Sequence, residues 1–234
     1  ASLVALLCAR ELTTQHSQIK GGLQAEEKPL TVYASSQSHS SVEKAALLAG
    51  FGRDNVRLVD TDENHAIRID LLEQSIKDDI AQGFKPCALV ASTATTAFDN
   101  ISEMARLTKE HTMWLHVDAA MAGSAMILPE CRHLWQGVMD SHSVVLNPNK
   151  WLGVVFDYSL FYTPYSEHLI RVMSTNPSYL QTFADGQVTN YRDWGIPLGR
   201  RFRALKLWFL LKSEGAEGLR KRLRRDLENA KWLE

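Results

Sequence analysis

The sequence predicts an α/β domain with a mostly parallel central sheet that is flanked by helices. Short apolar runs typical of buried strands recur between residues 30 and 146. Segments with the apolar spacing of amphipathic helices separate these runs, and glycines follow some of the helical segments. Strands that alternate with helices in this way indicate βαβ units, whose crossovers are right-handed.

Composition and charge narrow the class of protein further. The 234 residues carry 26 Lys and Arg against 27 Asp and Glu, and 45% are hydrophobic. These globular values exclude a disordered chain and disfavour a basic nucleic-acid-binding protein. No uninterrupted apolar stretch approaches the ~18 residues of a membrane-spanning helix. Three cysteines without a CxxC motif argue against a disulfide scaffold or a zinc site, so we expect a cytoplasmic protein.

The chain opens with a helical pattern over residues 1–10, and strand-like and helical segments then alternate. Residues 30–34 predict a buried strand, residues 40–48 a helix, and residues 56–59 a second strand. Asp70 is predicted to cap the next helix. Its apolar face holds Leu71, Leu72, Ile76 and Ile80, and Gly83 follows its end. The later elements are strand 87–91, helix 101–110, strand 114–117 and strand 144–146.

The pattern changes after Lys150. Residues 153–163 alternate aromatic and small side chains, which predicts a strand that leaves the parallel order. Residues 174–190 show no periodicity, and a polar segment of this length is typical of a functional or mobile loop. Two helices follow, over 200–213 and from Leu219 to Ala230, separated at Gly215. No Met begins the chain and its last residues still show a helical pattern, so we expect truncation at both ends.

Chemically useful side chains follow the predicted strands. Ligands of open α/β sheets bind outside the carboxyl ends of the strands. The residues that follow the strands are His39, Thr93 to Thr96, Asp118 and Asn147 to Lys150. No dinucleotide fingerprint, P-loop or HExxH motif is present. His116 and Asp118 share one face of a strand, but no further metal ligands can be placed beside them, so no metal site is predicted.

A lysine and an aspartate at one sheet edge suit pyridoxal phosphate. This cofactor needs an amine for a Schiff base and a carboxylate beside its pyridine nitrogen, which keeps the ring protonated. Lys150 and Asp118 provide both groups, and Trp151 is placed to exclude water. Each residue alone has a simpler interpretation: a solvated lysine, a turn aspartate and, for His39, a helix-start residue.

Five motifs in order resemble the pyridoxal-phosphate-dependent group II decarboxylases, in particular the aromatic L-amino-acid decarboxylase family. The resemblance covers nearly the whole chain. The motifs are Ser38 to Ala45, His116-Val117-Asp118-Ala119-Ala120, Ala122-Gly123-Ser124-Ala125, Asn147-Pro148-Asn149-Lys150-Trp151 and Trp194 to Arg203.

The resemblance implies the fold and the assembly. It implies the fold type I of pyridoxal-phosphate enzymes, with residues 1–199 as the cofactor-binding large domain. Residues 200–234 would lead toward a C-terminal small domain that is mostly absent. Members of the family form homodimers with active sites at the interface, so we expect a homodimer and no nucleic-acid or membrane partner.

The resemblance also implies roles at the cofactor. Lys150 would form the Schiff base, Asp118 would pair with the pyridinium nitrogen, and His39 would stack on the ring. The remaining expected cofactor contacts are Thr96, Thr95, Ala120, Asn147 and Asn149. Asn149 stands where the family usually has His, and the family's phosphate-binding serine would precede residue 1.

The implied reaction is decarboxylation of an aromatic L-amino acid (tryptophan, phenylalanine, tyrosine or DOPA) to the arylalkylamine and CO2. Tyr179 matches the loop tyrosine that protonates the substrate carbon, whereas relatives with Phe there tend to make aldehydes. Phe156 and Gly199 would line the substrate pocket, and Gly199 leaves room for an indole. The alternatives are a histidine or other amino-acid decarboxylase, an aromatic aldehyde synthase, or a non-catalytic fragment. We interpret the basic run Arg200, Arg201, Arg203 and Lys206 as structural ion pairs.

Overall fold

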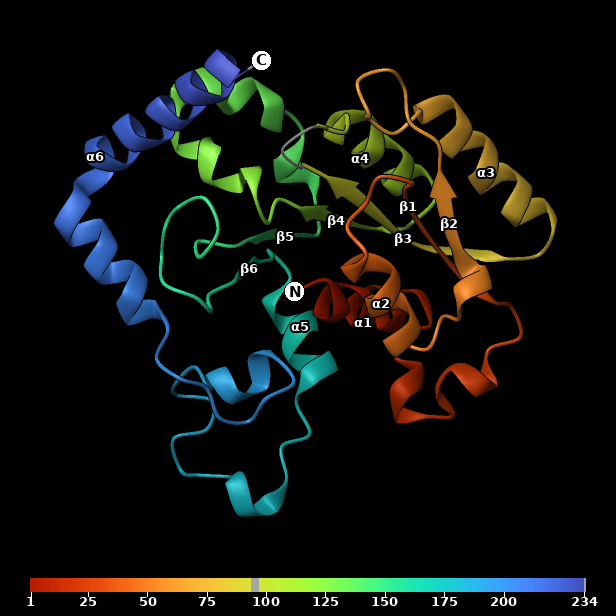
Figure 1. Cartoon of the computed structure of the whole chain (residues 1–234). Coiled ribbons are helices and arrows are strands. Elements are labelled where there is room, and N and C mark those ends of the chain that lie inside the picture. The colour runs from red at the N-terminus through yellow and green to blue at the C-terminus, as the bar shows by residue number, and fades with distance from the viewer. Residues whose placement is uncertain (94–96, 234) are drawn as a thin grey trace.

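The computed structural model describes residues 1–93 and 97–233, which form a six-stranded sheet between layers of helices (Figure 1). The strand order is β2-β1-β3-β4-β5-β6, and only β6 runs antiparallel to its neighbour. The predicted mostly parallel sheet is therefore confirmed. The strands are β1 (Leu30–Ser35), β2 (Val56–Val59), β3 (Lys85–Ser92), β4 (Trp114–Asp118), β5 (Ser143–Leu146) and β6 (Leu160–Tyr162).

The helices also follow the predicted order. They are α1 (Ser2–Thr13), α2 (Ser41–Leu48), α3 (Ile69–Ala81), α4 (Ile101–Glu110), α5 (Ser166–Met173) and α6 (Ala204–Leu233). The prediction that Asp70 caps α3 is wrong, because the helix begins at Ile69 and its N-cap is Arg68. Asp70 lies in the first turn, where its carboxylate pairs with the Arg68 guanidinium. A negative charge in the first turn still favours the helix through its dipole.

Two glycines mark helix ends as the sequence predicts. Gly83 follows α3 with a φ of 87°, a left-handed conformation that costs glycine little. Gly215 has a φ of 66° inside α6 and divides it into two helices at the predicted position. The first of these begins at Ala204, so the segment from Arg200 to Arg203 is not helical.

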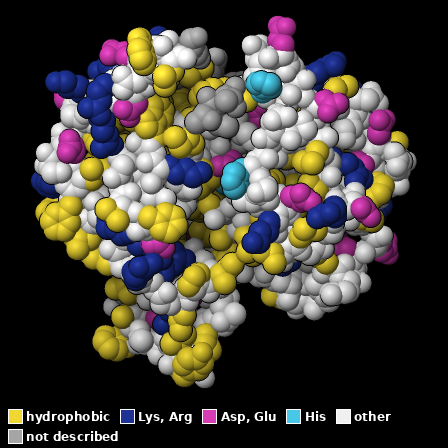
Figure 2. Space-filling view, viewed as in Figure 1, with side chains coloured by type: hydrophobic (Ala, Val, Ile, Leu, Met, Phe, Trp, Pro, Cys, Tyr) yellow, Lys and Arg dark blue, Asp and Glu magenta, His cyan; other side chains and the backbone are white. Residues whose placement is uncertain are grey.

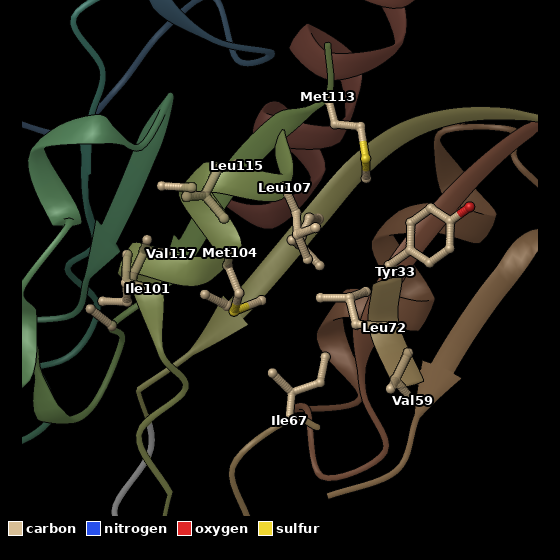
Figure 3. Close-up of a cluster of buried hydrophobic side chains, with 14 of the residues drawn as sticks. Tyr33, Val59, Ile67, Leu72, Ile101, Met104, Leu107, Met113, Leu115 and Val117 are labelled. Atoms are coloured by element: carbon tan, nitrogen blue, oxygen red, sulfur yellow. The ribbon is translucent and has the colours of Figure 1, made fainter. Parts of the chain in front are cut away.

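Two apolar layers hold the helices on the sheet. On one face α3 and α4 pack over the sheet, and Figure 3 shows Leu72, Met104, Leu107 and Leu115 in this cluster. On the other face α1, α2 and α5 pack around fully buried side chains that include Trp114 of β4. Because side chains alternate along a strand, Trp114, His116 and Asp118 share this second face of β4.

The chain after Lys150 is less regular than predicted. Of residues 153–163, only Leu160–Tyr162 form the expected antiparallel strand, and the residues before it form an irregular loop. The segment 174–190 holds only the short 3₁₀ turn Ser178–Leu180, hydrogen-bonded turns and one isolated bridge between Asp185 and Val188, in agreement with its lack of periodicity. Within the described residues, no helix combines the length and apolar character needed to cross a membrane.

Candidate active site

The carboxyl ends of four adjacent strands bring the predicted residues to one edge of the sheet. His39 follows β1, Asp118 ends β4, and Lys150 follows β5. All three line one cleft of about 720 Å³. Figure 2 shows acidic, basic and histidine side chains around a hollow near the centre of this face. The strand order explains the convergence, since β1, β3, β4 and β5 are consecutive parallel neighbours.

The backbone around β4 fixes the Asp118 carboxylate at the edge. Its Oδ1 accepts the backbone N–H of Ala120 at 3.1 Å. Its backbone carbonyl accepts the N–H of Thr93, which follows β3, at 3.0 Å. Ala120 and Thr93 line the same cleft, so the wall is continuous from β3 to β5.

A hydrogen-bonded loop presents the Lys150 side chain to this cleft. The Lys150 N–H donates to the Asn147 carbonyl at 2.9 Å, and the Asn147 N–H donates to the Ala120 carbonyl at 3.1 Å. Trp151 adds an anchor, because its Nε1 donates to Oδ2 of Asp226 on α6 at 3.1 Å. The Lys150 side chain is therefore exposed to the cleft while its backbone is held.

The two asparagines beside the lysine have different surroundings. Asn147 lines the cleft, and its buried Oδ1 has no hydrogen-bond partner among residues 1–93 and 97–233. Buried polar atoms are nearly always paired, so this oxygen marks a place for a polar ligand. Asn149 Oδ1 instead accepts the N–H of Tyr158 at 3.3 Å, a contact that stabilises the loop after the lysine.

His39 is exposed in the cleft, and its ring is oriented by the start of α2. The backbone N–H of Ser41 donates to His39 Nδ1 at 3.1 Å, and the Ser41 hydroxyl lies 2.7 Å from the same atom. A backbone N–H can only donate, so Nδ1 is the acceptor and the neutral ring carries its proton on Nε2. His39 therefore lies at the start of α2, as its simpler interpretation predicts, and also lines the cleft.

A second cleft of about 760 Å³ adjoins the first and shares Lys150 and Asn147 with it. The predicted substrate-pocket residues Phe156 and Gly199 both line this second cleft. Asp157 is held by Arg203 and Arg201, each with a contact of 2.9 Å. The hydrogen bond from Arg203 is the main cause that holds the pKa of Asp157 at about 2. The predicted structural ion pairs of the basic run are confirmed at these two arginines and at Lys206, which also pairs with Asp157.

The remaining predicted residues are two threonines and Tyr179. Thr95 and Thr96 lie outside the described residues. Tyr179 lies in the 3₁₀ turn Ser178–Leu180, is 80% exposed and lines neither cleft. Among the residues that the structure describes, no group of three His, Cys, Asp or Glu side chains could hold a metal ion.

The clefts also hold residues to which sequence reasoning gave no role. Thr93 is one of the threonines selected because they follow a strand, and it lines the cleft directly after β3, although only Thr95 and Thr96 were expected to contact the cofactor. Ser159 lines both clefts. It comes from the irregular loop before β6, where no sequence pattern marks it.

A buried polar chain runs beneath Asp118. Trp114 Nε1 donates to Ser143 Oγ at 2.9 Å, and Ser143 Oγ lies 2.8 Å from His116 Nδ1. His116 is fully buried, and desolvation by burial lowers its pKa to about 4, while the charge of Asp118 opposes that shift.

This histidine should make the fold acid-sensitive. Above pH 6.5 the ring is neutral whether the chain is folded or unfolded, so burying it does not reduce the free energy of unfolding there. As the pH falls from 6.5 toward 4, the unfolded chain binds a proton that the folded chain rejects, and about 3 kcal/mol is lost. Urea unfolding across this pH range should show a flatter profile for His116→Gln. Parallel profiles for the two proteins would contradict this assignment.

A family model, individual relatives and a solved structure all match this chain to decarboxylases. The profile described as "Pyridoxal-dependent decarboxylase conserved domain" matches residues 1–234. The chain is 42% identical to a histidine decarboxylase of Drosophila melanogaster, with 100% of this chain and 28% of that protein covered. It is 40% identical to tryptophan decarboxylase 2 of Oryza sativa subsp. japonica, with 100% and 48% covered. A crystal structure of Oryza sativa TDC with PLP and tryptamine has a TM-score of 0.92 at 35% identity, with 98% of this chain and 48% of that chain covered. The chain thus spans about half the length, or less, of these relatives.

Proposed function

The chain belongs to the pyridoxal-dependent decarboxylase family, and from this premise we propose that the protein converts an aromatic L-amino acid to the arylalkylamine and CO2. The substrates proposed are tryptophan, phenylalanine, tyrosine and DOPA. The observation that carries the proposal is one cleft lined by Lys150, Asp118 and Asn147, whose buried Oδ1 has no partner among the described residues.

The donor set fits pyridoxal phosphate. When bound, this cofactor supplies a protonated pyridine ring that accepts the electrons released as CO2 departs. Lys150 would hold it covalently through Nζ, and Asp118 would keep a proton at the ring nitrogen. The buried Oδ1 of Asn147 is a ready acceptor for a polar group of the cofactor. His39 would cover one side of the ring, and Ala120 would leave space on the other.

The finer site assignments extend this proposal. We place Asn149 near the cofactor through the lysine loop, although its Oδ1 already accepts the Tyr158 N–H. Thr95 and Thr96 remain proposed contacts. Residues 1–199 are proposed as the cofactor-binding domain and residues 200–234 as the connection to a further small domain. A homodimer with shared active sites is proposed as the assembly.

The second cleft supports an aromatic substrate. Phe156, which is 81% exposed, offers a ring face for stacking, and Gly199 adds no side chain to the space beside it. Histidine is the second candidate, because the Drosophila histidine decarboxylase is as similar to this chain as the tryptophan decarboxylase is. Imidazole and indole differ in size and polarity, so one pocket should prefer one of them clearly.

A product assay tests the proposal. Full-length protein loaded with pyridoxal phosphate should release CO2 and an amine from at least one of tryptophan, phenylalanine, tyrosine and DOPA. Conversion of histidine alone would select the second candidate. A folded, loaded protein that converts none of the five amino acids would refute the proposed reaction.

Tyr179→Phe should redirect the reaction from the amine toward the aldehyde, which consumes dissolved O2 and water and releases CO2, ammonia and hydrogen peroxide. A phenol can donate a proton to the substrate carbon after CO2 leaves, and a phenyl ring cannot. Because Tyr179 is exposed and lines neither cleft, we propose that it reaches the site when the 174–190 segment closes or from the partner subunit. Amine and aldehyde yields are measured by chromatography, with Tyr191→Phe, another exposed tyrosine, as the matched control. Unchanged amine formation in Tyr179→Phe would exclude the proton-donor role.

A further inference from the structure

We propose that His116 is a positioning residue that holds Asp118 as an anion, at the end of a buried chain formed by Trp114, Ser143 and His116. The inference rests on the proposed function, because it concerns the carboxylate assigned to the cofactor nitrogen. His116 itself does not line the cleft and would act only through Asp118.

The hydrogen-bonded chain begins at a group that can only donate. Trp114 Nε1 can only donate, and it donates to Ser143 Oγ at 2.9 Å. The single hydroxyl proton of Ser143 is then free to point to His116 Nδ1, which lies 2.8 Å away. We assign this hydroxyl proton to His116 Nδ1, which places the proton of the neutral imidazole on Nε2.

That Nε2–H is buried and has no hydrogen-bond partner among the described residues. Asp118 lies two residues further along β4, on the same face of the strand, and it is the acidic group whose charge acts on His116. No direct hydrogen bond joins His116 Nε2 to the carboxylate, so the connection that we propose runs through a bridging water.

The surroundings of His116 leave few competing groups. Ser143 of β5 lies on its Nδ1 side, and the Phe161 ring of β6 lies 6.2 Å away, centroid to centroid. The backbone of Ser143 also makes a hydrogen bond to the ring. Of the described residues, only Ala120 makes a hydrogen bond to the Asp118 carboxylate, at Oδ1. A second donor would stabilise the anion and fix its orientation.

Two variants separate this role from simple packing. His116→Leu fills the space but donates nothing, whereas His116→Gln keeps an N–H donor at a similar reach. In full-length protein loaded with pyridoxal phosphate, the pH midpoint of the lysine-bound chromophore is measured by absorbance. If Asp118 is less often ionised, the pyridine nitrogen of the bound cofactor is less often protonated. The pKa of the linkage at Lys150 should then rise.

We expect the midpoint of His116→Leu to rise by about one pH unit, the effect of losing one hydrogen bond to a charged group. His116→Gln should stay near the wild-type midpoint. Urea unfolding of both variants is measured in parallel, because a packing role predicts that Leu is tolerated better than Gln. Wild-type midpoints in both variants would overturn the proposal. So would midpoint shifts that correlate with the free energy of unfolding and not with the presence of an N–H donor at position 116.

A readout without cofactor keeps this inference separate from the proposed function. In ¹⁵N-histidine-labelled full-length protein without cofactor, His116 should show a proton on Nε2 whose resonance moves in Asp118→Asn. A proton on Nδ1, or no response to Asp118→Asn, would overturn the inference. If the wild-type protein forms no chromophore with pyridoxal phosphate, the proposed function fails, and the resonance measurement still decides the role of His116.

Discussion

Lys150→Ala should abolish the absorbance of the lysine-bound cofactor and reduce decarboxylation by at least roughly 10³-fold, as expected when a covalent nucleophile is removed. Lys150 is the lysine that lines both clefts, and alanine offers no amine in its place. The backbone bonds of the loop do not involve its side chain, so the variant should fold normally. Absorbance spectra and product release in full-length protein measure the two effects.

Lys109→Ala is the matched control. Lys109 lies in the last turn of α4 and pairs with Asp140 at 2.6 Å, outside both clefts. Removing this exposed pair should cost at most about 1 kcal/mol of stability and leave the chromophore unchanged. A chromophore of wild-type intensity in Lys150→Ala would mean that another amine holds the cofactor.

Asp118→Asn should lower kcat by roughly 10²- to 10³-fold, the range found when a preorganised charged partner is lost from an active site. The amide has nearly the same shape and can still accept the Ala120 N–H, so the strand end should be preserved. It cannot raise the pKa of a pyridine nitrogen as a carboxylate does. Cofactor affinity should fall as well, which equilibrium dialysis measures.

The comparison variant for this prediction is Asp140→Asn, which removes an equal charge at an exposed position outside the clefts. It should match the wild-type protein in kcat and in cofactor affinity. If Asp118→Asn also retains wild-type kcat, the carboxylate is not the partner of the ring nitrogen and the assignment of Lys150 loses its main support.

Most of the fold could be predicted because its signals are local. The strand at 56–59 and the helix at 101–110 were predicted with their observed bounds, since buried apolar runs and helical spacing are properties of short segments. The Asp70 cap was wrong for an equally local reason, since the Arg68 side chain engages this carboxylate within the first turn. The strand predicted over 153–163 was too long, because alternation alone does not determine how many residues find a pairing partner on β5.

Some residues of the candidate site could likewise be selected from local sequence signals, and others could not. His39, Asp118 and Lys150 could be selected from the sequence because each lies at or after the end of a strand and belongs to a motif, and the carboxyl ends of β1, β4 and β5 point to the same side of the sheet. Ser159 could not, because its place in both clefts depends on how an irregular loop folds back over the sheet. The sequence also offered no reason to separate Asn147 from Asn149, whose different environments depend on Tyr158, nine residues beyond Asn149.

By itself, the sequence determined the order of elements, the sheet type and the chemistry available at the strand ends. Only the tertiary structure decided that the Asn147 oxygen finds no partner in the described part of the chain and that Trp151 ties the lysine loop to Asp226. It alone placed Ser143 between Trp114 and His116. The physical reason is that apolar periodicity acts between near neighbours, whereas a buried donor or acceptor finds its partner only after distant segments have packed and excluded water.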